Sequence, residues 1–142
     1  MKWDEYREHC KKWRMDLEPV EYIAVLLLGI REEYDEFFIE FKASCIEKII
    51  EEYGDMLFNI AELVNVLEEN FSHFRGNDLG EFFAPRKCVE VVRKSYMRDR
   101  NNLKFIGEAW QIAERCVLEY TRTNTAQDSM IHSVEKLTGR HG

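Results

Sequence analysis

Apolar residues recur every three or four positions along most of this chain, which is the spacing of an α-helix with one buried face. Residues 3–16 form the first such stretch, in which Trp3, Tyr6, Cys10 and Trp13 share one side. This pattern predicts a short, charged helix that covers the core. The alternative, that Trp3 or Trp13 stacks on a base, stays open.

The pattern then predicts two long helices in succession. Pro19 suits the first turn of a helix, where its missing N–H group costs nothing, and the apolar period continues to about Lys42. After a short turn, Ser44 can cap a second helix that begins at Ile46 and continues to about Phe74. Because the connection is short, we expect the two helices to lie side by side and antiparallel.

The rest of the chain is also predicted to be helical, with polar interruptions. The clearest loop is residues 75–80, which contain two glycines together with asparagine and aspartate. Further helices are predicted over 85–98, 103–120 and 126–137, with polar breaks at 98–102 and 121–125. No stretch of the sequence has the pattern of a β-hairpin. We therefore expect an all-α fold: one domain over residues 1–142, built as a helical bundle with two long antiparallel central helices.

Length and charge narrow the classes of function. A chain of 142 residues with 45% hydrophobic residues is long enough for one domain with a substantial core. Its net charge of −7 disfavours nucleic acid as a partner, because that affinity comes largely from neutralised phosphates. The longest apolar run, from Ile23 to Ile30, is far shorter than the ~20 residues of a membrane span, so no membrane partner is expected.

The start of the chain and its cysteines indicate a compartment. The first residues turn acidic at Asp4, which is unlike a secretory signal peptide. The four cysteines form no CxxC pair and no zinc-like group with the histidines. We therefore expect reduced thiols in a soluble, cytoplasmic protein.

The most informative motif is a short acidic repeat. Residues 31–38 read REEYDEFF and residues 50–57 read IEEYGDML, so each stretch carries an acid, two residues and another acid. The pairs are Glu33 with Glu36 and Glu52 with Asp55. Acids spaced i, i+3 share one side of a helix, so two packed helices could turn four carboxylates toward one another. Such groups repel and raise one another's pKa unless a cation lies between them.

This repeat predicts a divalent-metal site, because hard carboxylate oxygens suit Mg²⁺, Mn²⁺ or Ca²⁺. Both acid pairs lie at the edge of the core-facing stripe of their helices, and Asn59 and Glu62 continue the second pair along that edge. Gly54, inside the second helix, indicates that some group approaches the backbone there. The alternative is an ordinary solvated acidic face.

A di-iron site is a rival interpretation of a helical bundle rich in carboxylates. Such a site needs two Glu-x-x-His pairs in addition to two further carboxylates. The residues three positions before the four histidines are Tyr6, Asn70, Ser129 and Thr138, so the sequence excludes this rival.

The two acidic stretches resemble the motifs of the MazG-like family of all-α nucleoside triphosphate pyrophosphohydrolases. That family carries E-E-x-x-E, a spacer and then E-E-x-x-D on its two central helices; here residues 32–36 read EEYDE and residues 51–55 read EEYGD. The resemblance is good over residues 20–70. A further stretch, KLTGRH at residues 136–141, is similar to a basic K-L-x-x-R-H segment of some members, and Lys48 matches a position that is basic in some members.

The resemblance implies hydrolysis of a nucleoside triphosphate to its monophosphate and pyrophosphate, with Mg²⁺, or Mn²⁺ in its place, as cofactor. By this resemblance, the metal ligands are Glu33, Glu36, Glu52 and Asp55. Glu32 or Glu51 is the candidate general base, and the candidate phosphate-binding residues are Lys48, Lys136 and Arg140. An alternative for Lys136 and Arg140 is that they complement the dipole at a helix C-terminus. The resemblance also implies a homo-oligomer, either a dimer or a tetramer.

Two further questions stay open. The aromatic residue that stacks on the base could be Trp13, Phe37 or Trp110. The chain could also be a non-catalytic interaction protein that keeps the bundle, lacks turnover and binds a partner through an exposed apolar face. Metal-dependent thermal stabilisation distinguishes a metal-binding cluster from a solvated acidic face.

Overall fold

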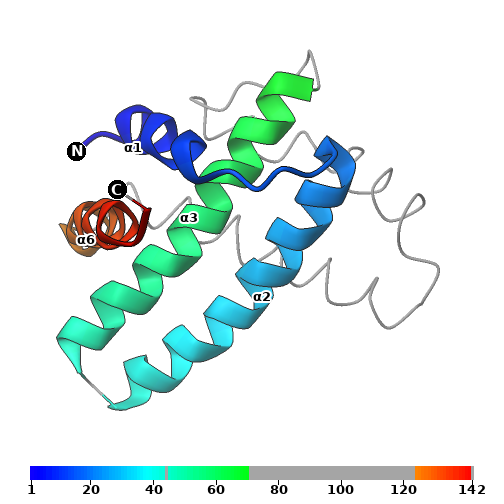
Figure 1. Cartoon of the computed structure of the whole chain (residues 1–142). Helices are drawn as coiled ribbons and strands as arrows, with labels where there is room; N and C mark the ends of the chain where they lie inside the picture. Colours follow the sequence, from blue (N-terminus) through cyan, green and yellow to red (C-terminus); the bar gives the residue numbers. More distant parts are fainter. Residues whose placement is uncertain (44, 71–123, 142) are drawn as a thin grey trace, which may run out of the picture.

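The structure of the chain is a computed structural model, and it describes residues 1–43, 45–70 and 124–141. These residues form an all-α bundle of packed helices, with no strand among them (Figure 1). The predicted fold class is therefore confirmed. The loop predicted at 75–80 and the helices predicted over 85–98 and 103–120 lie outside the described residues.

The first helix, α1, is shorter than the helix predicted over residues 3–16. It spans Trp3–Cys10 and is followed by a single 3₁₀ turn, η1, at Lys11–Trp13. Tightening into 3₁₀ geometry is common at the end of an α-helix, and here the chain becomes extended at Arg14 directly afterwards. Trp3 is buried in the core, so the prediction that this helix covers the core is confirmed.

The two long central helices are those predicted from the apolar period. α2 spans Pro19–Ala43 and α3 spans Ile46–Asn70, and they lie side by side and antiparallel (Figure 1). They approach closely at Gly29, where a Cβ atom would lie 3.0 Å from the side-chain oxygen of Asn59. No described helix is both long enough and apolar enough to cross a bilayer.

The last described helix, α6, spans Asn124–His141 and packs across α3. It is longer than the helix predicted at 126–137, and it continues through Gly139, where a Cβ atom would meet open space. A glycine costs an exposed helix only about 1 kcal/mol relative to alanine. The cost of this glycine is therefore too small to end a helix that is held by its packing on α3.

The hydrophobic core consists of the apolar faces of α1, α2 and α3 together with Met130 of α6. α3 contributes much of it, because α2, α1 and α6 all pack against it. Its fully buried side chains include Met56, Leu57, Ile60, Ala61, Leu63 and Leu67. α3 is therefore the central helix of the described bundle, and its acids meet α2 on one side and α6 on the other.

Gly54 is needed for the contact between α3 and α6. A Cβ atom at this position would lie 2.8 Å from the backbone carbonyl oxygen of Ser129, closer than real Cβ atoms come. The same region is tied together by Tyr6, whose hydroxyl oxygen lies 2.8 Å from that of Ser133. The prediction that a group approaches the backbone at Gly54 is confirmed. The group is α6, so the glycine is explained by helix packing.

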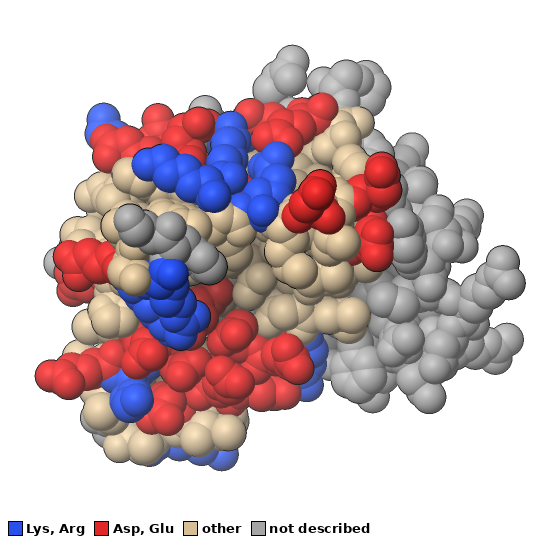
Figure 2. All heavy atoms as spheres, viewed as in Figure 1, with Lys and Arg blue, Asp and Glu red and all other residues tan. Residues whose placement is uncertain are grey.

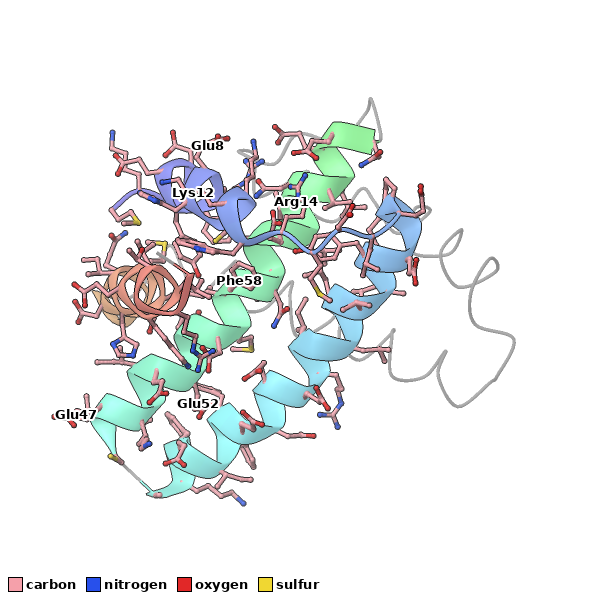
Figure 3. The ribbon with its side chains drawn as sticks, in the orientation of Figure 1. Glu8, Lys12, Arg14, Glu47, Glu52 and Phe58 are labelled. Atoms are coloured by element: carbon pink, nitrogen blue, oxygen red, sulfur yellow. The ribbon has the colours of Figure 1, made fainter. Side chains whose placement is uncertain are left out.

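A polar network around the buried Glu62 of α3 joins this helix to the N-terminal segment through Arg14 (Figure 3). Glu62 is fully buried, and its two carboxylate oxygens accept hydrogen bonds from Arg14 at 2.9 and 3.0 Å. The Tyr22 hydroxyl and the Asn65 amide also donate to Glu62, at 3.0 and 2.9 Å. Glu62 thus continues the edge in helical position, but its charge is paired with Arg14 and it is not one of the converging acids.

Candidate metal centre

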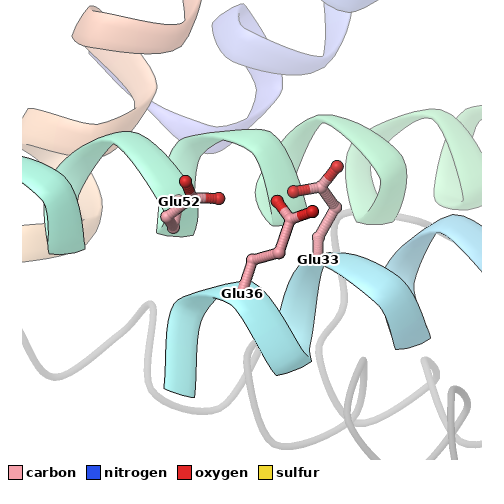
Figure 4. A group of neighbouring side chains, drawn as sticks. All are labelled: Glu33, Glu36 and Glu52. Carbon is pink, nitrogen blue, oxygen red and sulfur yellow. The ribbon is translucent and has the colours of Figure 1, made fainter. Parts of the chain in front are cut away.

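Three carboxyl groups converge between the two central helices. Glu33 and Glu36 lie on the same side of α2, and Glu52 faces them from α3 (Figure 4). One oxygen from each group lies within 4.8 Å of the other two. In Figure 4 the Glu36 carboxyl group lies between those of Glu33 and Glu52. The convergence follows from the i, i+3 spacing on α2 and from the antiparallel packing of α3.

Burial and neighbouring carboxylates change the acidity of two of these groups. Burial, followed by the charge of Glu36, raises the pKa of Glu33 to about 8. Burial, followed by hydrogen bonding with Glu36, raises the pKa of Glu52 to about 7. The charge of Asp55 adds to both shifts. The cluster therefore resists full ionisation unless a positive charge is supplied.

The described part of the chain supplies no such charge to the cluster. None of its lysines or arginines forms an ion pair with Glu33, Glu36 or Glu52. Figure 2 shows acidic side chains gathered over the lower parts of α2 and α3 in that view. One oxygen of Glu33 and one of Glu52 are buried with no hydrogen-bond partner among the described residues. Because buried polar atoms are normally hydrogen-bonded, these two oxygens are available to bind a ligand.

The donor set fits a divalent cation. Carboxylate oxygens are the ligands that Mg²⁺, Mn²⁺ and Ca²⁺ prefer. Two oxygens on opposite sides of one ion lie about 4.2 Å apart for Mg²⁺ and about 4.6–5.2 Å apart for Ca²⁺. The three carboxyl oxygens, which lie within 4.8 Å of one another, are therefore close enough together to share one such ion.

Asp55, the fourth expected ligand, has a different partner. Its two carboxylate oxygens accept hydrogen bonds from the Lys136 ammonium group of α6, at 2.9 and 3.0 Å. Lys136 also donates to Glu51, at 3.3 Å. Partial burial acts to lower the pKa of Lys136, but the hydrogen bond to Asp55 and its charge raise that pKa overall. The structure thus brings three of the four expected ligands together and places the fourth against a lysine.

The other expected site residues differ in their surroundings. Glu32 is exposed on α2 and is not one of the converging groups. The hydrogen bond from Lys136 lowers the pKa of Glu51, which weakens Glu51 as a base. Lys48 is exposed, with its ammonium nitrogen 3.9 Å from a Glu51 oxygen, and Arg140 is exposed near the end of α6. Of these residues, Lys136 is the one that forms an ion pair with an expected metal ligand in the described part of the chain.

Two of the aromatic residues considered for stacking have packing roles. Trp3 belongs to the core, and Phe37 packs against Tyr53 with the ring centroids 5.5 Å apart. Trp13 is half-buried in η1, and Trp110 lies outside the described residues. Phe37 is also half-buried, so the structure does not choose between Trp13 and Phe37 for stacking on a base.

Sequence reasoning missed two ion pairs that shape this region. Lys136 and Asp55 are 81 residues apart in the sequence, and Arg14 and Glu62 are 48 residues apart. Helical spacing pairs only neighbours on one helix, so it cannot identify such partners. The available signal was Gly54, which indicates a close approach to α3 next to Asp55 but does not say which segment approaches.

No family model matches the chain, and no curated protein or solved structure matches it. The family suggested by the acidic motifs therefore stays a prediction that rests on residues 32–36 and 51–55. The structure adds the positions of their side chains: three of the acids converge, and the fourth pairs with Lys136.

Proposed function

We propose that this chain is a metal-dependent nucleoside triphosphate pyrophosphohydrolase, which converts a triphosphate and water to a monophosphate and pyrophosphate. The observation that carries the proposal is the convergence of Glu33, Glu36 and Glu52 with no cation of the described chain paired to them. By contrast, the buried Glu62 of the same helix is paired with Arg14. The resemblance of the acidic motifs to those of the MazG-like family supports the same reaction.

The roles of the residues follow from their positions. Glu33, Glu36 and Glu52 would hold Mg²⁺, or Mn²⁺ in its place, and Asp55 is the candidate fourth ligand. When bound, the metal neutralises charge on the phosphates and lowers the pKa of an attacking water. The basic residues Lys48, Lys136 and Arg140 would bind phosphate oxygens. The lowered pKa of Glu51 favours Glu32 as the general base.

The proposal is tested by pyrophosphate release with Mg²⁺ from the Glu52→Gln variant. This change keeps the size of the side chain and removes its charge, so we expect turnover to fall by at least roughly 100-fold with an unchanged helical circular dichroism spectrum. Glu47→Gln is the matched control, because Glu47 is an exposed glutamate at the start of the same helix (Figure 3). Normal turnover in Glu52→Gln would remove the cluster from the mechanism. The same assay across common and modified triphosphates identifies the preferred base and sugar.

A second candidate is a non-catalytic interaction protein of the same fold. Large apolar side chains are exposed near the C-terminal end of α2 and the start of α3: Phe38 (44%), Ile39 (64%), Phe41 (58%) and Ile46 (72%). Such a surface suits a protein partner or a second copy of the chain, so it also supports a homo-oligomer, a dimer or a tetramer. Stabilisation by Mg²⁺ without any pyrophosphate release would favour this second candidate.

A further inference from the structure

Lys136 lies against Asp55 because α6 packs tightly on α3. Ser129, Ser133 and Lys136 are spaced i, i+4 and i+7, so they share one side of α6. The Cβ position of Gly54 lies 2.8 Å from the Ser129 carbonyl oxygen and 3.4 Å from the Ser133 Cβ atom. The next turn along this side of α6 carries Lys136 to Asp55, the residue that follows Gly54. The position of the lysine is therefore set by the helix contact.

The pair formed by Lys136 and Asp55 is partly shielded from water. The two side chains are 19% and 27% exposed, and the ammonium nitrogen lies 2.9 and 3.0 Å from the two carboxylate oxygens. The neighbouring pair of Lys48 and Glu51 is 3.9 Å long, and its lysine is 58% exposed. A shielded pair with two short charge-assisted hydrogen bonds is stronger than an exposed pair at this longer distance.

Asp55 contacts this lysine and lies one helical turn from Glu52 of the three-glutamate cluster. It follows Glu52 by three residues, so both lie on the same side of α3. It is near enough for its charge to act on Glu33 and Glu52, although Lys136 is the cation that it contacts. Asp55 can therefore pair with either of two cations, the lysine or a divalent ion held by the cluster.

We propose that Lys136 is a latch: it holds Asp55 in the ion-free protein, and a divalent cation bound by the three glutamates competes for Asp55 and releases the lysine. This inference rests on the metal site of the proposed function. The released ammonium group can then bind a phosphate oxygen, which suits a flexible point charge. The latch thus couples the binding of the metal to the availability of a phosphate-binding lysine.

The latch is tested by Mn²⁺ binding without nucleotide, measured from the loss of the free-ion paramagnetic resonance signal. Because Lys136 competes with the ion for Asp55, Lys136→Met should bind Mn²⁺ roughly fivefold more tightly than the wild-type protein. Lys48→Met is the matched control, since it removes the same charge beside Glu51 and leaves Asp55 paired; its affinity should change by less than about twofold. Lys136→Gln is a second variant that repeats the test if Lys136→Met folds poorly.

The Asp55→Asn variant distinguishes competition for Asp55 from a general electrostatic effect of removing the Lys136 charge. If Lys136 acts through Asp55, Lys136→Met should give no further tightening in an Asp55→Asn background. Equal Mn²⁺ affinity of the wild-type protein and both Lys136 variants, or equal tightening by Lys48→Met, would overturn the latch and leave the metal site intact. A wild-type protein that binds no Mn²⁺ would overturn the latch together with the proposed function.

Discussion

Two glutamates on α3 show opposite ways of placing charge beside a protein core. Glu62 is fully buried, and both of its carboxylate oxygens accept hydrogen bonds from Arg14. One of them also accepts a hydrogen bond from the Tyr22 hydroxyl. Glu52, ten residues earlier on the same helix, faces two glutamates of α2 and pairs with no cation of the described chain. One of its oxygens is buried without a hydrogen-bond partner among the described residues.

Under the proposed function, this difference distinguishes a structural carboxylate, Glu62, from a metal-binding one, Glu52. The ion pair of Glu62 and Arg14 is complete within the chain, and it holds the N-terminal segment against α3. Carboxylates that face one another destabilise the ion-free fold, so their convergence has no structural benefit of its own. Proteins depart from favourable local arrangements mainly at functional sites. We therefore interpret the first region as a contribution to stability and the second as a contribution to binding.

Arg14→Met should cause the largest loss of stability, because it leaves the buried Glu62 without its cation. Removing one partner of a buried ion pair costs about 3–5 kcal/mol, and since Arg14 is 29% exposed we expect the low end, about 3 kcal/mol, in urea unfolding. Lys11→Met is the control, because Lys11 pairs with the exposed Glu8 in the same segment and should contribute less than about 0.5 kcal/mol. Equal losses in the two variants would contradict a structural role for the network.

Gly54→Ala should cause the next largest loss, because it pushes α6 and its lysine away from the acidic region. The added Cβ atom would lie 2.8 Å from a backbone oxygen, and overpacking of this kind costs about 2 kcal/mol in thermal or urea unfolding. Gly29→Ala is the matched control, because its Cβ atom would meet the Asn59 side chain at 3.0 Å, and a side chain can rotate away. If the two variants are equally stable, the contact at Gly54 does not position α6.

The smallest expected effect is a pH dependence of the ion-free protein. Folding raises the pKa of Glu33 and Glu52 from the ordinary value of 4.5 to about 8 and about 7, with burial as the main cause. The folded state thus holds these protons more tightly than the unfolded state. Their stabilising contribution is fully present below about pH 4.5 and is lost as the pH rises through about 7 to 8.

The melting temperature of chelator-treated protein should accordingly fall between about pH 5 and about pH 9. Glu52→Gln should flatten this fall and raise the melting temperature by roughly 2 °C at about pH 8. Glu52→Gln should therefore raise the stability, whereas Arg14→Met should lower it, although each variant removes one charge. A wild-type melting temperature that rises through this interval would show that the three acids do not repel one another in the fold.

The central helices could be predicted because the information that defines them is local. The apolar period and Pro19 locate α2, and the short connection makes α3 its antiparallel neighbour. The i, i+3 spacing then places Glu33 and Glu36 on one side of α2, facing Glu52. This part of the site depends on one helix pair, so the sequence was sufficient to predict that its acids meet.

The partners of Asp55 and Glu62 could not be predicted, because they come from distant segments. On a helical wheel both residues lie at the edge of the same apolar stripe, and nothing in their spacing distinguishes them. α6 brings Lys136 to Asp55, and the N-terminal segment brings Arg14 to Glu62. Tertiary packing therefore decides which acid remains near the cluster and which becomes part of the core.

The most direct test of the account is the change in melting temperature on adding MgCl₂ at about pH 8.5, measured for the wild-type protein and for Glu33→Gln. A ligand present at 100 times its Kd stabilises the folded state by about 2.7 kcal/mol, so the wild-type melting temperature should rise by several degrees. The variant lacks one of the three ligands, so it should gain little. An equal rise in both proteins, or no rise in the wild-type protein, would contradict the claim that Glu33, Glu36 and Glu52 bind a divalent cation.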